Sequence, residues 1–365
     1  MNRFSIHPKF SMSKWDVMNE FIAVTHGANH VLRNKELFEW FFLRNDNPDE
    51  ANVIVAYDQD KLVSLLGYIP SSFYFKGEVI YGAWMAHWMT LESYRNGIGA
   101  LLMRKITEMY PISAGQGASM MNQQIVKKMG FKFLENIPKV VKVFNPHKIS
   151  SLFGFKARNF SNVMSEIRLQ EVKGRLTPEI YAPDWRLYPA MEFSTLRDLS
   201  YLNHRFIDYP FMRYHLFILG PAISPAVCVC RIIDAMDVNG VPVVKVGRIL
   251  EFFYPETEAG TNQGMDLLRG VTRFLKEKDC DYIDFYCTKS YYIDFFHLNE
   301  FESDGEGELP SLLDPVDTGR KTQNFELYLS KDLHARFPRA AEEFFVSRAD
   351  GDQDRPNKSY QGIIR

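Results

Sequence analysis

A short glycine pair in the first third of the chain could bind an anion. Gly97 and Gly99 follow a stretch rich in Trp and Met, Met85–Thr90, and precede apolar residues at helical spacing from Ile98. The first N–H groups of a helix have no backbone partner, the helix dipole adds partial positive charge, and glycines let a phosphate approach the main chain. Arg95 could add a charged donor. The stretch therefore predicts a strand, an anion-binding loop and a helix.

The glycine pair does not fit two well-known nucleotide loops. A Rossmann loop needs three glycines as G-x-G-x-x-G, and a Walker loop needs a Lys after its last glycine. Gly97-Ile98-Gly99-Ala100 supplies neither. An ordinary tight turn from strand to helix is the alternative to an anion site, so the surrounding residues must decide.

These surroundings resemble the GNAT superfamily of acyl-CoA-dependent acyltransferases, whose pyrophosphate loop has the pattern Gln/Arg-x-x-Gly-x-Gly/Ala. Gly97 and Gly99 match the two small positions, while the first position falls on Tyr94 and Arg95 stands one place late. The resemblance implies a GNAT fold with acyl-CoA as the co-substrate. It also implies coenzyme contacts at Trp88, Met89, Thr90, Arg95, Asn96, Gly97, Ile98, Gly99, Ala100 and Asn122.

A second motif, Ile125–Phe131, resembles the end of the helix that follows the fifth strand of this family. Many members carry there a Tyr that protonates the leaving thiolate, but this chain has Val126 at that place. The resemblance thus implies an acyltransferase without its usual acid. It also implies that a backbone N–H of Met89 or Thr90 donates to the thioester carbonyl, because a strand that diverges from its neighbour leaves such groups unpaired.

Acyl transfer to an amine needs a route for the proton that leaves the amine. His87 is the first candidate base, because an imidazole with a pKa of about 6.5 suits proton removal near neutrality. Strand alternation would place His87 on the same face as Met89. The alternative is a hydrogen-bonded core histidine between Trp84 and Trp88.

Glu251 is the second candidate base. It lies on the apolar stretch Val243–Phe253, which corresponds to the motif strand in the second half of the chain. Alternation would put it on one face with Lys245 and Ile249, and Arg248 on the other. A carboxylate at a domain junction could orient an amine or take its proton, and a salt bridge across the interface is the alternative.

Residues for the acceptor are expected in the second half of the chain. Arg205 can pair with a phosphate, Tyr209 and Tyr214 can stack on a base or a sugar, and Arg248 is a further substrate-binding candidate. The alternative for Arg205–Tyr214 is a helix end that packs aromatic rings. No spacing of His, Cys, Asp or Glu forms a metal site, so we expect none.

The composition excludes several classes of protein. The 43 Lys and Arg against 45 Asp and Glu give a net charge of -2, which provides no general field for nucleic acid or an acidic membrane. The sequence has neither an 18-residue apolar span nor a signal peptide. Its four cysteines lie in apolar runs, as reduced core thiols would. We therefore expect a cytoplasmic protein, monomeric or homodimeric, that acts on small molecules.

With 365 residues, 46% of them apolar, the chain is long enough for two domains. Its second half repeats the order of the first without the glycine pair, which predicts two tandem GNAT-like α/β (α+β) domains, each a mixed, mostly antiparallel twisted sheet flanked by helices. The expected boundaries are an N-terminal GNAT domain with the acyl-CoA site at 1–150, a linker at 151–185, an acceptor-binding GNAT-like domain at 186–335, and a helix with a mobile tail at 336–365. In this division a strand at 140–143 closes the first domain, and a strand at 326–329 closes the second.

The tandem layout is similar to bacterial nucleotide-sugar N-acyltransferases of the D-anthrose type. This implies acylation of the amine of a dTDP- or UDP-linked amino sugar in polysaccharide biosynthesis. A Fem-like aminoacyltransferase is one alternative; it would take its donor from a charged tRNA and would not need the pyrophosphate loop. The other alternative is a binding protein on a decayed acyltransferase pair, for which the missing Tyr at Val126 would be a sign of lost chemistry.

Overall fold

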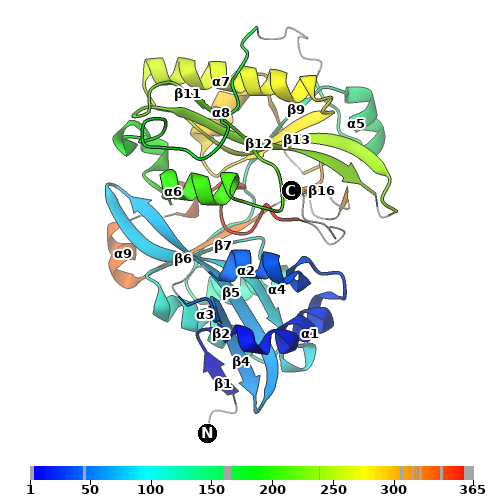
Figure 1. Cartoon of the computed structure of the whole chain (residues 1–365), viewed down its shortest axis with the longest axis vertical. Coiled ribbons are helices and arrows are strands. Elements are labelled where there is room, and N and C mark those ends of the chain that lie inside the picture. The colour runs from blue at the N-terminus through cyan, green and yellow to red at the C-terminus, as the bar shows by residue number, and fades with distance from the viewer. Residues whose placement is uncertain are drawn as a thin grey trace.

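The computed structural model describes residues 4–43, 47–158, 166–237, 239–304, 307–313, 316–317, 319, 323–337 and 340–356. These residues form two lobes, one above the other in Figure 1, and each lobe is built on a twisted sheet flanked by helices. The expected class, a mixed α/β fold with mostly antiparallel mixed sheets, is confirmed. None of the helices in the described part of the chain is long and apolar enough to cross a membrane.

The first sheet has the strand order β1-β4-β5-β6-β7-β18-β8, and β10 pairs with the far end of β5. Its strands are β1 (Phe4–His7), β4 (Val53–Asp58), β5 (Lys61–Phe75), β6 (Glu78–Thr90), β7 (Ile112–Gln116), β8 (Lys132–Leu134), β10 (Phe193–Thr195) and β18 (Phe325–Leu329). Neighbouring strands are antiparallel except β6 and β7. Turns with left-handed backbone at Gln59 and at Lys76-Gly77 join the two hairpins, which is the conformation that tight hairpins require.

Two pairs of helices cover the two faces of this sheet. α1 (Trp15–His26) and α2 (Lys35–Phe42) pack on one face, and α3 (Ile98–Met109) and α4 (Met120–Lys128) pack on the other. The buried residues of α2 show why it docks, since they recur at helical spacing: Leu37, Phe38, Phe41 and Phe42. The side chains of β6 divide between the two faces, with Trp84 on the α1/α2 side and Met85 on the α3/α4 side.

The second sheet has the order β11-β12-β13-β14-β9-β15. Its strands are β9 (Lys139–Val143), β11 (His215–Leu219), β12 (Ala226–Met236), β13 (Pro242–Phe253), β14 (Tyr282–Tyr286) and β15 (Glu302–Ser303), and its main helices are α7 (Glu258–Glu277) and α8 (Ser290–Leu298). As in the first sheet, a long antiparallel hairpin, β12–β13, leads into a parallel neighbour, β14. The second lobe therefore repeats the order of the first.

The last strands of the two lobes are exchanged. β18, near the end of the chain, inserts between β7 and β8 of the first sheet, whereas β9 joins the second sheet between β14 and β15. The expectation that residues 140–143 close the first unit and 326–329 the second is therefore wrong. Either strand offers short alternating apolar residues that can pair in both sheets, so local pattern does not choose the partner.

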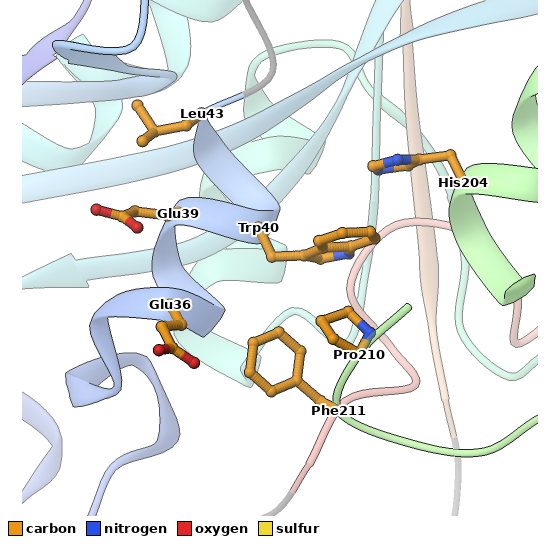
Figure 2. A pocket seen from close by; sticks show the side chains of 7 residues that line it. All are labelled: Glu36, Glu39, Trp40, Leu43, His204, Pro210 and Phe211. Atoms are coloured by element: carbon orange, nitrogen blue, oxygen red, sulfur yellow. The ribbon is translucent and has the colours of Figure 1, made fainter. Parts of the chain in front are cut away.

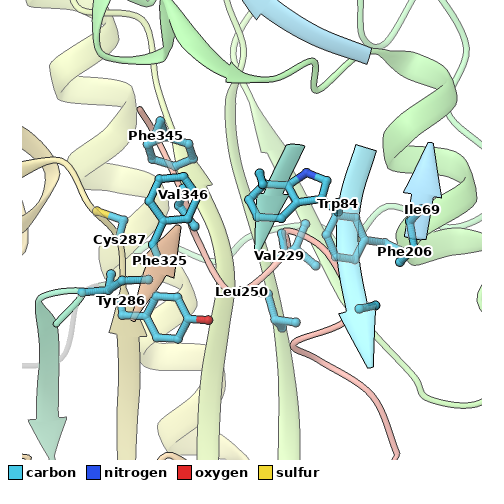
Figure 3. Close-up of a cluster of buried hydrophobic side chains, with 14 of the residues drawn as sticks. Ile69, Trp84, Phe206, Val229, Leu250, Tyr286, Cys287, Phe325, Phe345 and Val346 are labelled. Atoms are coloured by element: carbon cyan, nitrogen blue, oxygen red, sulfur yellow. The ribbon is translucent and has the colours of Figure 1, made fainter. Parts of the chain in front are cut away.

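The C-terminal segment, defined as residues 340–356, passes between the lobes (red in Figure 1). Most of residues 344–354 are buried, so the predicted mobility of the tail is wrong for these residues, and the rest of the tail lies outside the described residues. Figure 3 shows the core that the segment completes: Trp84 comes from the first lobe, Leu250 and Tyr286 come from the second, and Phe345 and Val346 belong to the segment.

The remaining short elements are β2 (Phe10–Ser11), β3 (Glu50–Ala51), α5 (Pro146–Phe153), α6 (Leu199–Leu202), β16 (Leu312–Leu313), β17 (Val316–Asp317) and α9 (Lys331–Arg336).

Candidate active site

The strands β6 and β7 separate after two residue pairs. Ala83 pairs with Ser113 and Trp84 pairs with Ala114, after which β6 continues to Thr90 along β5 alone. Beyond Trp84, the edge of β6 that faces β7 is therefore not used in the sheet. A fork between two parallel strands can receive an extended ligand, because the free edge offers N–H and C=O groups.

The strand, loop and helix around the glycine pair form as predicted, and the loop lies at the end of this fork. A 3₁₀ turn (Glu92–Tyr94) follows β6, Gly97 has a φ of 108°, and α3 begins at Ile98. The left-handed φ explains Gly97, since other residues rarely adopt it. Arg95, Asn96 and Gly97 are exposed, so the start of α3 is open to a ligand.

Gly99 also has a packing role that the sequence did not reveal. A Cβ atom there would stand 2.8 Å from the indole ring of Trp88, so this glycine lets α3 pack closely against β6. The Trp88 indole thus packs against the first turn of α3. Ile98 is buried in the same core and Ala100 is half-buried.

The other predicted coenzyme residues have mixed positions. Met89 is buried on the α1 side, where Thr25 Oγ1 lies 3.7 Å from its sulfur. Thr90 Oγ1 hydrogen-bonds to Ser64 Oγ at 2.7 Å. Asn122 is half-buried in the first turn of α4, with its backbone N–H on Ser119 Oγ. The side chains that remain open to a phosphate are those of Arg95 and Asn96.

His87 stands at a bulge in β6. Leu66 pairs with Trp88 and Gly67 with Ala86, which leaves His87 as the extra residue, with a φ of 53°. Such a left-handed conformation costs a non-glycine residue about 1–3 kcal/mol and often marks a functional position. A Cβ at Gly67 would overlap Phe42 and the Ala86 carbonyl, so Gly67 makes room for the bulge.

The bulge interrupts simple alternation along β6, yet His87 and Met89 lie on the same face, as expected. Trp84 and Ala86 lie on the α1/α2 side and Trp88 on the α3/α4 side, whereas simple alternation would place Trp88 with Ala86. His87 faces the α1/α2 side because of its backbone, and its ring centroid lies 5.5 Å from that of His30 and 6.4 Å from that of Phe42.

The C-terminal segment supplies a partner for His87 that the sequence did not reveal. Nε2 of His87 lies 2.9 Å from Oδ2 of Asp352, and both side chains are about 95% buried. Arg355 contacts the same carboxylate. Burial alone would raise the pKa of Asp352, but the charges of Arg355 and His87 lower it. Burial and Arg355 lower the pKa of His87, against the opposing effect of Asp352, so the imidazole is neutral at pH 7.

Glu251 is fully buried in a separate cluster. Its carboxylate lies 2.9 Å from Arg197 Nε and 3.2 Å from Ser347 Oγ, and Arg197 also binds Asp350 at 2.6 Å. Burial raises the pKa of Glu251 to about 7, although Arg197 opposes the shift. The salt-bridge alternative therefore describes Glu251, with its partners in the second lobe and the C-terminal segment.

Arg248 does not face an open site either. Its guanidinium binds Asp284 with distances of 2.7 to 3.2 Å, and Arg348 of the C-terminal segment lies 3.4 Å from the same carboxylate. A register shift of β13 between Ile249 and Glu251 breaks the alternation that the sequence suggested.

Arg205, Tyr209 and Tyr214 lie together, as expected, but they are buried. Nε of Arg205 donates to the Ala349 carbonyl at 3.2 Å, and Tyr214 donates to Asp354 at 2.8 Å. The C-terminal segment thus covers the residues that were predicted to bind the acceptor. The packing alternative holds for this cluster in the described structure.

An open pocket of about 450 Å³ lies beside this cluster. Figure 2 shows its lining: Glu36, Glu39 and Trp40 from α2, Leu43 directly after α2, and His204, Pro210 and Phe211 from the second lobe. The Trp40 and His204 rings stack with centroids 4.5 Å apart. Two carboxylates beside aromatic rings favour a cationic ligand over an anionic one.

The start of α7 in the second lobe differs from the start of α3. At the start of α7, Thr257 Oγ1 accepts from the N–H of Gly260, and a Cβ at Gly260 would stand 2.1 Å from the Pro255 carbonyl. The bulged residue of β13, which corresponds to His87, is the buried Leu250. Within the described residues, the glycine pair and the bulged histidine of the first lobe have no counterpart at the matching places in the second lobe.

The structure holds no metal cluster within the described residues, where no three His, Cys, Asp or Glu side chains are grouped to bind an ion.

The residues around His87 that the sequence missed are Asp352 and Arg355. One available signal was Gly67 inside a strand, which is typical of a bulge and points to His87.

Comparison with known proteins agrees with this geometry. Residues 14–133 match the family model described as an acetyltransferase (GNAT) domain. No curated protein matches the chain. The N-myristoyltransferase of Saccharomyces cerevisiae with bound myristoyl-CoA superposes with a TM-score of 0.52 and 10% identity, covering 90% of this chain and 83% of that one. A GCN5-related N-acetyltransferase from Kribbella flavida superposes with a TM-score of 0.52 and 14% identity, covering 89% and 72%. At these identities the likeness establishes the fold.

Proposed function

We propose that this chain, a GNAT-type N-acyltransferase with acyl-CoA as its co-substrate, transfers the acyl group to the primary amine of a small acceptor, with His87 as the base. The observation that carries the proposal is the bulge of β6, which holds His87 against Asp352 next to the fork of β6 and β7. The pyrophosphate would bind the start of α3 at Gly97, and the pantetheine arm would run along the free edge of β6.

The chemistry of His87 follows from its neighbours. Asp352 occupies Nε2, which leaves Nδ1 to take the proton of the amine as its nitrogen attacks the thioester carbonyl. Because the pKa of His87 is lowered, the imidazole is in its accepting form at pH 7. Asp352 stabilises the imidazolium that forms, as carboxylates do beside catalytic histidines.

The acceptor is proposed more broadly than the sequence suggested. The hypothesis of a dTDP- or UDP-linked amino sugar requires a site for a diphosphate, but Arg205 and Arg248 are bound by protein groups. The pocket with Glu36 and Glu39 suits a cationic amine better. The acceptors to be tested therefore include simple cationic amines as well as nucleotide-linked amino sugars. We expect the reaction in the cytoplasm.

The test combines binding and turnover. Calorimetry should show one coenzyme A per chain, and His87→Ala should lower kcat by roughly 10²–10⁴-fold with little change in coenzyme affinity. His297→Ala, an exposed histidine of α8, is the matched control. Donors should include myristoyl-CoA, because the yeast N-myristoyltransferase structure holds it. Normal turnover of His87→Ala would contradict the role of His87 as the base. Two molecules of coenzyme A bound per chain would contradict the proposal of a single site.

A further inference from the structure

A buried acid lies at the fork on the exchanged strand β18. Phe325 and Leu327 of this strand pack on the α1/α2 side of the first sheet, and Tyr328 packs on the α3/α4 side. By strand alternation Glu326 faces the α3/α4 side with Tyr328. In the register of β18 with β7, Glu326 stands directly opposite Gly115.

The carboxyl group lies where β6 and β7 begin to separate. Met85 and Gly115 are the first residues beyond the last β6–β7 pair. A methyl group at Gly115 would stand 2.5 Å from Oε1 of Glu326 and 3.0 Å from the terminal methyl of Met85. A side chain at position 115 would displace the ends of Glu326 and Met85, so the glycine leaves space for the carboxyl group beside the fork.

The environment of Glu326 leaves part of its hydrogen-bonding capacity unused. The residue is 6% exposed, and its Oε2 has no hydrogen-bond partner among the described residues. The hydroxyl of Ser113, on the same face of β7, also lacks one within the part of the chain that the structure describes. Buried polar atoms are nearly always paired, so two such atoms beside a fork point to a ligand that reaches them.

Burial raises the pKa of Glu326 to about 8, so the group is mostly protonated at pH 7. A protonated carboxyl is a proton donor, whereas an ionised one only accepts. The helix that carries the usual acid of this fold cannot provide one here, because Val126 is apolar and packs in the same core as Met85.

We propose that the carboxyl group of Glu326 gives its proton to the sulfur of coenzyme A as the thioester breaks. This step rests on the proposed function. The amine nitrogen forms a bond to the carbonyl carbon, the C–S bond breaks with its electron pair on sulfur, and the Glu326 proton moves to that sulfur. Free thiol leaves, His87 holds the proton of the amine, and both residues return to their starting states by exchange with water.

The test compares Glu326→Gln with Tyr328→Phe, a control on the same strand and face. Glu326→Gln keeps the size of the side chain but cannot donate an acidic proton, so kcat should fall by roughly 10²-fold while coenzyme A affinity by calorimetry changes little. Wild-type turnover should also fall above pH 8, as the carboxyl ionises, and this alkaline limb should be missing in Glu326→Gln. Glu326→Asp, with an acid on a shorter arm, should recover part of the rate.

The outcomes separate this role from the proposed function. If wild-type protein binds acyl-CoA and transfers the acyl group, but Glu326→Gln keeps the same kcat and the same alkaline limb, the acid role is overturned. If all variants lose coenzyme affinity together, Glu326 is a packing residue and the proposal also fails. If wild-type protein releases no thiol with any amine, the proposed acyl transfer itself is contradicted. The role of Glu326 then falls with it, because there is no thiolate to protonate.

Discussion

His87 and Asp352 form a buried pair whose charge is set by a third group. Arg355 keeps the Asp352 carboxylate ionised, and the ionised carboxylate raises the pKa of His87 against burial. Burial and Arg355 still leave the pKa of His87 below that of a free histidine, so the proposed base is neutral at pH 7. Such a pair can take a proton in the transition state without an ionised imidazole in the ground state.

This arrangement predicts a pH effect for Asp352→Asn. Removing the carboxylate removes the interaction that raises the pKa of His87, so the acid limb of kcat should move to lower pH, and the plateau should fall by roughly 10–10³-fold because the imidazolium loses its partner. The measurement is the pH profile of turnover. Glu251→Gln, in the separate cluster with Arg197, should leave the position of the acid limb unchanged. An acid limb that does not move in Asp352→Asn would mean that Asp352 only supports the fold.

The sequence identified His87 by its chemical type and its place before the glycine loop. It did not show the bulge, because backbone geometry depends on Gly67 and Phe42 in other elements. Asp352 was missed because a polar segment is usually mobile when its charges have no buried partner. Here each charge has a buried partner: Asp350 binds Arg197, Asp352 contacts His87, and Asp354 accepts a hydrogen bond from Tyr214.

At the scale of elements, the strand, loop and helix around Gly97 were predictable because the pattern is local. The purpose of Gly99 was not, since the Trp88 ring reaches it from the neighbouring strand. The hairpins and both pairs of helices in the first lobe likewise follow from local turns and apolar spacing. Buried acids such as Glu326 depend on which strand lies beside β7, and local pattern did not determine that.

Gly99→Val tests the contact between loop and strand. The added side chain would overlap the Trp88 indole, so we expect a loss of roughly 1–3 kcal/mol in unfolding free energy, together with weaker coenzyme binding. The same substitution in a Trp88→Ala background should cost much less, because the obstacle is gone. Chemical denaturation of the four proteins measures this coupling. Equal losses in both backgrounds would show that the contact with Trp88 does not explain the glycine at this position.

At the scale of the molecule, exchanged strands and the C-terminal segment connect the described parts of the two lobes. Strands β9 and β18 each cross to the other lobe, and the C-terminal segment binds both. In the second lobe, buried Arg197, Arg205 and the partly buried Arg231 all have partners in this segment. We therefore expect the two lobes to unfold as one cooperative unit, with the proposed base His87 at their junction.

A chain that ends at Val346 should be strongly destabilised. It would leave several buried cations without partners, and breaking one buried pair typically costs about 3–5 kcal/mol. We expect a large drop in the midpoint of denaturation and loss of turnover. A chain that ends at Pro356 keeps every contact described for the segment and is the control. If the shorter chain unfolds at the same denaturant concentration as the control, the segment is a removable cover and not part of the fold.

The exchanged strand β18 also has a consequence for synthesis on the ribosome. The first sheet has β7 and β8 early in the chain, but the strand between them is made roughly 190 residues later, which corresponds to about 10–40 s at usual elongation rates. During that time β7 presents a bare edge to solvent, and strands already made, such as β8 and β9, could pair there by mistake. Native assembly then requires β9 to be free for β14. Cells that make this protein quickly should therefore depend on chaperones that shield nascent strand edges.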